Sequence, residues 1–337
     1  MTTPVQVKAP EHGQWCVLKD GLYWLRQRLP FDLDHINVYA LAATDGWSAV
    51  DTGINSGSSK KTWRAFQKDA MGDVAPTRLI CTHLHPDHVG LAGWFAHELG
   101  APLFMTRAEY LQCRILVADT GRPAPDEGVS FYRAAGYSQV QLDKYRADFG
   151  GFGRIVAPLP ESYRRLRAGM VLEVGGRTWR VVVGSGHSPE HACLFNETDN
   201  IMLSGDQLLP KISSNVSVWP TEPLNDPLRD WLDSCAHLLE VIDDETLVCP
   251  AHGLPFTGGP ARLRQLIASH QRKLDFLLER LDAPMRAVDV ADYLFPTAEP
   301  KQSILAVGET LAHLNYLIEA GKVIRSREEQ VDIYTRA

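Results

Sequence analysis

The stretch His83-Leu84-His85-Pro86-Asp87-His88 places three imidazoles and one carboxylate within six residues. It follows Leu79-Ile80-Cys81, a short apolar run that is typical of a buried strand. Burying three neighbouring histidines in an apolar core would leave ring nitrogens unpaired, and an ordinary solvent-exposed loop gains nothing from them. Neutral imidazole and carboxylate are typical zinc ligands. The stretch therefore predicts a metal site.

Four further motifs follow apolar, strand-like runs elsewhere in the chain. They are Val50-Asp51-Thr52-Gly53, Gly186-His187-Ser188, Leu203-Ser204-Gly205-Asp206 and Pro250-Ala251-His252-Gly253. Taken singly, His187 is more typical of a surface residue, Asp206 has the alternative of a turn or helix-cap residue, and His252 that of a turn residue. Their shared placement at strand ends predicts that these loops meet at one edge of a sheet, where a rigid scaffold carries catalytic groups.

In this order, the motifs resemble those of the metallo-β-lactamase-fold hydrolases, whose signature is HxHxDH, and the resemblance covers roughly residues 15–260. The ligands that it implies for one zinc ion are His83, His85 and His187. Those that it implies for a second zinc ion are Asp87, His88 and His252, with Asp206 bridging the two ions. It also implies that Asp51 orients ligands from behind.

The resemblance implies a hydrolase in which a metal-bridging hydroxide attacks the substrate, with Asp87 and Asp206 as the acidic residues of the catalytic centre. Two zinc ions are the expected cofactors, and iron and manganese remain alternatives. No GxSxG motif surrounds a candidate nucleophilic serine. His191 lies four residues beyond His187, and we expect it to support the ligands from behind or to pack at the start of a strand.

The residues near the bridging position narrow the substrate class. The resemblance implies that Asp206 disfavours β-lactam hydrolysis, and that Leu209 stands where many acyl-homoserine lactonases carry tyrosine. The leading hypothesis is hydrolysis of a small thioester, ester or lactone. A phosphodiesterase, including an RNase-like enzyme, is the alternative reaction. A metal-containing, DNA-binding regulator is the alternative from another class of protein.

Strand-like and helix-like segments occur in both halves of the chain, which predicts two sheets face to face with helices outside. This α/β arrangement matches the four-layer αββα sandwich that the resemblance implies. We expect residues 1–260 to form this catalytic domain. Residues 106–168 predict a mostly helical insertion, rich in aromatic residues that include Phe131 and Tyr132. A lid over the metal site and a structural appendage or dimer contact are both open interpretations.

Residues 261–337 predict a small C-terminal domain. Helices are expected near 261–281, 287–294 and 304–319, followed by short strands at 321–324 and 331–334. This order resembles a winged-helix module. Residues 304–319 carry Glu309, His313 and Glu319 but no arginine or lysine, which is poorly suited to phosphate contacts. We therefore expect a packing or dimerisation element, and a homodimer remains open.

The composition of the 337-residue chain is that of a globular protein, with 45% hydrophobic and 22% charged residues. A net charge of −7 argues against a nucleic-acid-binding surface and leaves a small-molecule substrate as the expected partner. No uninterrupted apolar run reaches membrane-spanning length, and the first residues lack a signal-peptide pattern. The cysteines are scattered without paired spacing, so we expect a cytoplasmic protein without membrane contact.

Overall fold

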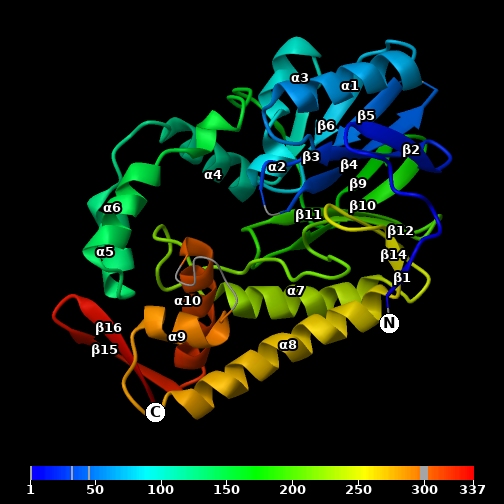
Figure 1. Ribbon diagram of the computed structural model, residues 1–337. Helices are drawn as coiled ribbons and strands as arrows, with labels where there is room; N and C mark the ends of the chain where they lie inside the picture. The colour runs from blue at the N-terminus through cyan, green and yellow to red at the C-terminus, as the bar shows by residue number, and fades with distance from the viewer. Residues whose placement is uncertain (1, 32, 45, 297–302) are drawn as a thin grey trace.

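Two seven-stranded sheets form the centre of the computed structural model, which describes residues 2–31, 33–44, 46–296 and 303–337 (Figure 1). The first sheet runs β2 (Gln14–Lys19), β3 (Leu22–Arg28), β4 (His35–Ala43), β5 (Gly46–Val50), β6 (Pro76–Ile80), β7 (Leu103–Met105) and β8 (Arg164–Arg165). The second runs β1 (Thr3–Pro4), β14 (Phe256–Thr257), β13 (Leu247–Pro250), β12 (Ile201–Gly205), β11 (His191–Asn196), β10 (Arg177–Gly184) and β9 (Val171–Val174).

Helices cover the outer face of each sheet. The first sheet packs against α1 (Gly57–Ala70) and α3 (Ala92–Glu98), and the second packs against α7 (Pro227–Val241) and α8 (Gly259–Arg280). A third apolar cluster lies between the two sheets and draws side chains from both. This arrangement confirms the predicted four-layer αββα sandwich.

The central strands are buried on both faces, which explains their nearly continuous apolar sequences. In β12, Ile201 and Leu203 face the other sheet, whereas Met202 faces the helices. The strand pairs β5–β6, β6–β7 and β12–β13 are parallel, so their carboxyl ends lie at the same edge of each sheet. The loops at these edges carry most of the sequence motifs described above.

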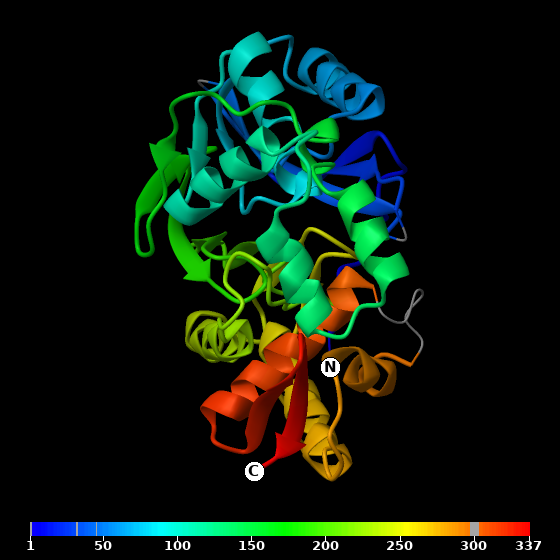
Figure 2. The same cartoon turned by 90° about the vertical axis from the view of Figure 1, so that its left-hand side faces the viewer.

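The segment 106–168 is mostly helical, as predicted, and contains α4 (Arg107–Ala118), α5 (Asp126–Ala134), α6 (Gln139–Asp148) and a short 3₁₀ helix η1 (Phe152–Arg154). Figures 1 and 2 show α5 and α6 beside the C-terminal part of the chain. Val288 N–H donates to the Ala135 carbonyl at 3.0 Å, and Phe131 packs against the same apolar cluster as Tyr132. The insertion therefore links the sandwich to the C-terminal helices, and its role as a lid stays a prediction.

The C-terminal elements confirm the predicted order of helix, helix and two strands. After α8 come α9 (Ala287–Leu294), α10 (Ile304–Glu319), β15 (Val323–Glu328) and β16 (Val331–Arg336), with the two strands antiparallel. The predicted division between residues 260 and 261 falls within α8, and that division and the winged-helix assignment stay predictions. In the described part of the chain, no helix has the length and hydropathy needed to cross a membrane.

We predict that Tyr132→Ala loosens the docking of the insertion. The Tyr132 ring is 2% exposed, and its centroid lies 5.1 Å from that of Tyr137 and 4.7 Å from that of Tyr145. Truncating a buried aromatic side chain costs about 3–5 kcal/mol of unfolding free energy. Hydrogen exchange should show faster amide exchange in α5, α6 and α9. Val140→Ala, at a side chain that is 80% exposed, is the control, and equal exchange in both variants would contradict the docking.

Candidate metal centre

The predicted ligands come from both sheets rather than from one sheet edge, and this corrects the expectation from the sequence. The HxHxDH stretch follows β6 of the first sheet, while His187, Asp206 and His252 follow β10, β12 and β13 of the second. His85 precedes the short helix α2 (Pro86–Val89) with an extended backbone, and Pro86 occupies the first helical position, where its missing N–H costs no hydrogen bond. The facing sheets thus bring their loops together at a common end.

The first group of ligand atoms comprises His83, His85, His187 and Asp206, all within 4.8 Å of one another. His83 Nε2 lies 2.9 Å from His85 Nδ1, which lies 3.1 Å from His187 Nε2. Asp206 Oδ2 lies 3.3 Å from His187 Nε2. Ligand atoms about 2.0–2.1 Å from a zinc ion stand at such separations from one another, so this group fits one ion.

The second group comprises Asp87, His88 and His252, again within 4.8 Å. Asp87 Oδ2 lies 3.3 Å from His252 Nε2 and 3.6 Å from His88 Nε2. Asp206 reaches this group as well, with Oδ2 3.5 Å from His88 Nε2 and Oδ1 3.5 Å from His252 Nε2. Because the Asp206 carboxylate touches both groups, it stands where a bridging ligand would.

Each of four histidines that turn Nε2 toward the centre pairs its Nδ1 with a protein oxygen. The pairs are His83 with Thr82 Oγ1 at 3.0 Å, His88 with Asp51 Oδ2 at 2.8 Å, His187 with the Asn215 carbonyl at 2.7 Å and His252 with the His35 carbonyl at 2.8 Å. Such outer partners fix the ring orientation and the tautomer of a metal ligand. Asp51 lies against the outer nitrogen of His88, and its φ of 59° is unusual for a residue with a side chain. Its role in orienting the ligands stays a prediction.

The electrostatics differ between the two ligand groups: His83 and His85 favour the uncharged imidazole, whereas the Asp87 and Asp206 carboxylates outweigh burial and raise the pKa of His88 and of His252. Burial lowers the pKa of His83 well below its usual value, and burial together with His187 lowers that of His85 to about 3. Burial alone would raise the pKa of Asp206, but His252 and His88 hold it well below its ordinary value. Neutral imidazole and ionised carboxylate are the forms that bind transition metals.

Two atoms of the centre are buried polar groups that the surrounding protein leaves unsatisfied. Within the described residues, His88 Nε2 and Asp206 Oδ1 have no hydrogen-bond partner. An unpaired buried polar atom costs free energy, so such atoms call for an explanation. A cation between the two ligand groups would satisfy both atoms. The residues present therefore fit a pair of metal ions.

His191 contacts the backbone of the residue at the bridging position. The Asp206 N–H donates to His191 Nε2 at 3.1 Å, and the His191 ring is completely buried. Gly205 between them has a φ of +50°, and a Cβ at that position would lie 2.5 Å from His191 Nε2. The histidine ring thus occupies the space that glycine leaves. His191 is also the first residue of β11, so support of the bridging residue and packing at a strand start both stay predictions.

Glu109 of α4 is a buried residue of the centre that the sequence did not single out. Its carboxylate accepts the Leu84 N–H at 2.9 Å and the Glu190 N–H at 2.8 Å. Leu84 lies between two ligands of the HxHxDH stretch, and Glu190 lies three residues beyond His187. Glu109 therefore hydrogen-bonds to both ligand loops. The sequence predicted a helical segment here, but nothing in it indicated which backbone groups this glutamate would bind.

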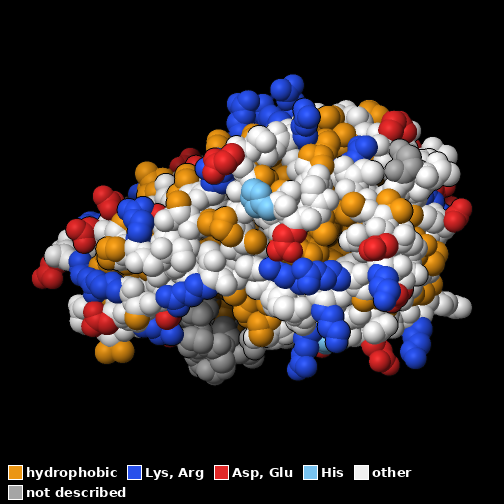
Figure 3. Space-filling view, turned by 90° about the horizontal axis from the view of Figure 1, so that it is seen from above, with side chains coloured by type: hydrophobic (Ala, Val, Ile, Leu, Met, Phe, Trp, Pro, Cys, Tyr) orange, Lys and Arg blue, Asp and Glu red, His pale blue; other side chains and the backbone are white. Residues whose placement is uncertain are grey.

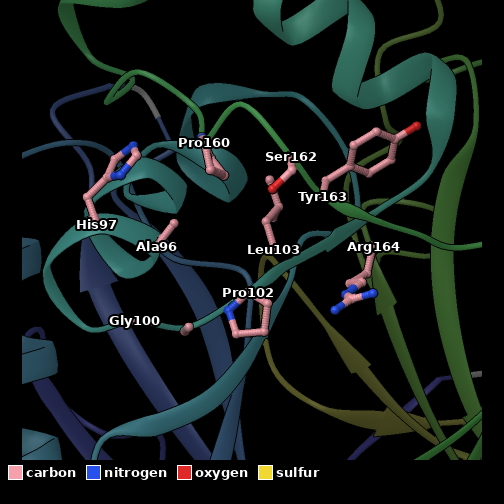
Figure 4. Close-up of a pocket in the computed structure, with 10 residues that line it drawn as sticks. Ala96, His97, Gly100, Pro102, Leu103, Pro160, Ser162, Tyr163 and Arg164 are labelled. Atoms are coloured by element: carbon pink, nitrogen blue, oxygen red, sulfur yellow. The ribbon is translucent and has the colours of Figure 1, made fainter.

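A pocket of about 450 Å³ lies elsewhere on the sandwich (Figure 4). Its lining includes Ala96 and His97 of α3, the residues leading into β7, and the segment Pro160–Arg164. These residues lie before β7 and β8 or at their first positions, whereas the ligand loops follow the carboxyl ends of their strands. No predicted ligand lines this pocket, so we do not assign it to the metal centre.

We predict that His191→Ala lowers turnover by about tenfold to a hundredfold while both metals stay bound, because supporting groups behind ligands have effects of this size. Metal analysis and steady-state kinetics on the same preparation check this. His237→Ala, at an exposed histidine of α7, is the control. Loss of a whole metal equivalent in His191→Ala would instead make His191 a direct ligand.

Comparisons with known proteins agree with the geometry. A family model described as the metallo-beta-lactamase superfamily matches residues 31–252, and one described as metallo-beta-lactamase-like, C-terminal domain, matches residues 274–337. The probable metallo-hydrolase YqjP of Bacillus subtilis (strain 168) is 28% identical over 325 residues, which are 92% of this chain and 96% of YqjP. The acyl-coenzyme A thioesterase MBLAC2 of Homo sapiens is 24% identical over 268 residues, 76% of this chain and 86% of MBLAC2.

A solved structure extends the similarity to nearly the whole chain. The crystal structure of a beta-lactamase domain protein from Burkholderia ambifaria has a TM-score of 0.89 and 36% identity, covering 98% of this chain and 97% of its own. The seven predicted ligands fit the HxHxDH site. The chain therefore belongs to the metallo-beta-lactamase superfamily and is one of its hydrolases.

Proposed function

We propose that the chain is a dinuclear zinc hydrolase that cleaves a small thioester. The observation that carries the proposal is the pair of ligand groups joined by the Asp206 carboxylate, with the outer nitrogens of His83, His88, His187 and His252 already paired. A purely structural zinc site is one ion closed by four ligands, whereas this centre offers seven ligands in two groups that share one carboxylate.

Two zinc ions, when bound, supply hydroxide near neutral pH and stabilise negative charge that develops on a carbonyl oxygen. The chain's own residues position the ligands for these ions. Asp206 keeps the two ligand groups together, and Asp87 adds a second negative charge at the His88–His252 side. Asp51 and the Asn215 carbonyl keep the rings of His88 and His187 from turning.

The thioester assignment is supported by the similarity to the acyl-coenzyme A thioesterase MBLAC2, which spans most of both chains. Esters and lactones remain the neighbouring substrate classes, since the same attack on a carbonyl cleaves them. The phosphodiesterase alternative stays open, and a comparison of substrates decides it.

A DNA-binding regulator is disfavoured by the burial of α10, the helix that would have to enter the groove. Eleven of its residues are buried, among them Glu309 and His313, and it packs against α7, α8 and α9. Figure 3 shows acidic and basic side chains mixed over much of one face, with a group of basic side chains at its upper edge. We therefore propose a small molecule as the partner.

The metal and the cellular location belong to the same proposal. Zinc is favoured over iron and manganese because histidines dominate the ligand set, although imidazole also binds iron. A cytoplasmic location is supported by the cysteines, five of which are buried as free thiols. A homodimer stays an open prediction.

We predict that the protein reconstituted with zinc carries two ions per chain, one for each ligand group. Asp206→Ala should lose one ion and roughly a thousandfold or more in turnover, because catalytic groups that act as a unit fail together. Metal analysis, turnover and circular dichroism on one sample check this. At most one ion in the wild-type protein with excess zinc, or near-native turnover of Asp206→Ala, would contradict the dinuclear assignment.

We predict that acyl-coenzyme A thioesters are cleaved with a higher kcat/KM than lactones, simple esters or phosphodiesters. Chelation should abolish the activity, and zinc should restore it. Asp206→Ala, purified identically, is the blank that reveals contaminating esterases. A higher kcat/KM for a phosphodiester than for any thioester would move the protein to the alternative class.

A further inference from the structure

One hydrogen-bonded path leads from the metal centre into the C-terminal helices. His187 Nδ1–H donates to the Asn215 carbonyl at 2.7 Å, which directs Nε2 toward His85 and Asp206. Asn215 belongs to the segment between β12 and α7, which lacks helix and strand in this region. Ser217 Oγ donates to Asn215 Oδ1 within the segment, and the remaining contacts of Asn215 come from other elements.

Those contacts come from α10, which Figure 1 shows rising toward this segment. Asn215 Nδ2–H donates to Glu309 Oε2 at 3.1 Å, and Val218 N–H donates to the Gly308 carbonyl at 3.1 Å. A Cβ at Gly308 would lie 2.8 Å from Ser217 Cβ, so helix and loop meet at backbone distance. The loop that orients His187 is thus packed against a helix about ninety residues later in the chain.

The Glu309 side chain is buried and paired with a lysine. The side chain is 8% exposed, and its Oε1 accepts from Lys273 Nζ of α8 at 2.8 Å. A buried carboxylate left without its partner is strongly unfavourable, so this ion pair fixes where the carboxylate stands. Both oxygens of Glu309 are therefore used, one for the lysine and one for Asn215.

His270 and His313 complete the cluster around Glu309. These three residues have ligand atoms within 4.8 Å of one another, as a metal site would require. The histidines, however, pair with each other at 3.2 Å, and His313 Nδ1–H donates to the Glu309 carbonyl. With Lys273 already on the carboxylate, a further cation would be repelled. The two histidines instead hydrogen-bond to each other between α8 and α10, beside Glu309.

We propose that Glu309 is a positioning residue for the metal ligand His187 and acts through Asn215. The C-terminal helices are then part of the metal centre, because they hold the carbonyl that orients one of its ligands. The inference rests on the metal centre of the proposed function but not on the identity of the substrate.

The test compares Glu309→Ala with Asn315→Ala. Asn315 is the matched control, since it is a buried polar residue of the same helix whose Nδ2 donates to the carbonyls of Asn225 and Pro223, at the far end of the same segment. Metal dissociation constants are measured by chelator competition, and the ligand field is read from the absorption bands of the cobalt-substituted protein. Unfolding of the metal-free variants reports stability separately.

We expect Glu309→Ala to weaken one metal equivalent by about tenfold to a hundredfold, the range for partners that orient a ligand from behind. Asn315→Ala should leave metal affinity and cobalt bands unchanged, whatever it does to stability. Glu309→Gln, which keeps an acceptor for Asn215, should recover part of the loss and serves where Glu309→Ala does not fold. Equal metal binding in wild type and both Glu309 variants, or an equal loss in Asn315→Ala, would overturn the proposal.

A double-mutant cycle tests whether the path runs through Asn215. Asn215→Ala removes the amide that reaches Glu309 but keeps the backbone carbonyl that His187 uses. If Glu309 acts through Asn215, the double variant should bind metal as tightly as whichever single variant binds it more weakly. A loss of affinity in the double variant equal to the product of the two single losses would contradict the path. If the wild type bound a single ion, the proposed function would fail, and the same comparison would still decide the inference on the ion held by His187.

Discussion

The structure depends on satisfying four buried histidine ligands at once, His83, His88, His187 and His252. A metal-binding imidazole presents one nitrogen to the centre, and in a dry interior its other nitrogen needs a partner of its own. The partners here come from different parts of the chain: Asp51 beside the first sheet, the His35 carbonyl at the start of β4, and the Asn215 carbonyl after β12. Each partner sits on an element whose position is set by packing. The two facing sheets are therefore needed to complete the ligand set.

The need to fix the ligand loops and their partners also explains why elements outside the sandwich contact the metal centre. Glu109 of the insertion joins the HxHxDH stretch to the loop that follows His187, and Glu309 of the C-terminal helices braces Asn215. The insertion is in turn docked on the C-terminal elements through the bond between Val288 and Ala135 and through an apolar cluster that includes Tyr132. The metal centre thus lies within a loop of contacts that passes through all three parts of the chain.

Local patterns were enough to predict the layers, the helical insertion and the ligand residues. Apolar runs of strand length and the order of five short motifs carry that information within a few residues each. The supporting residues could not be predicted in this way, because their partners are far away in the chain: Glu109 and Glu190 are 81 residues apart, and Asn215 and Glu309 are 94 apart. A carboxylate on a helix has no local feature that reveals which backbone N–H it will meet.

The expectation of a single sheet edge was wrong for a related reason. Each motif showed that its ligand follows a strand, but β6 and β12 belong to different sheets, and strand pairing is a long-range property. Similarly, the aromatic residues of the insertion indicated apolar packing, but the contacts that join the end of α5 to the C-terminal elements are made with residues near 288.

The dinuclear centre is tested most directly by anomalous diffraction from crystals of the zinc-loaded protein at the zinc absorption edge. Two ions predict two peaks about 3.5–4 Å apart, the spacing of two-metal hydrolytic centres. One should be bound by His83, His85 and His187, the other by Asp87, His88 and His252, with Asp206 reaching both. A single peak, or a second peak outside these ligands, would contradict the dinuclear centre.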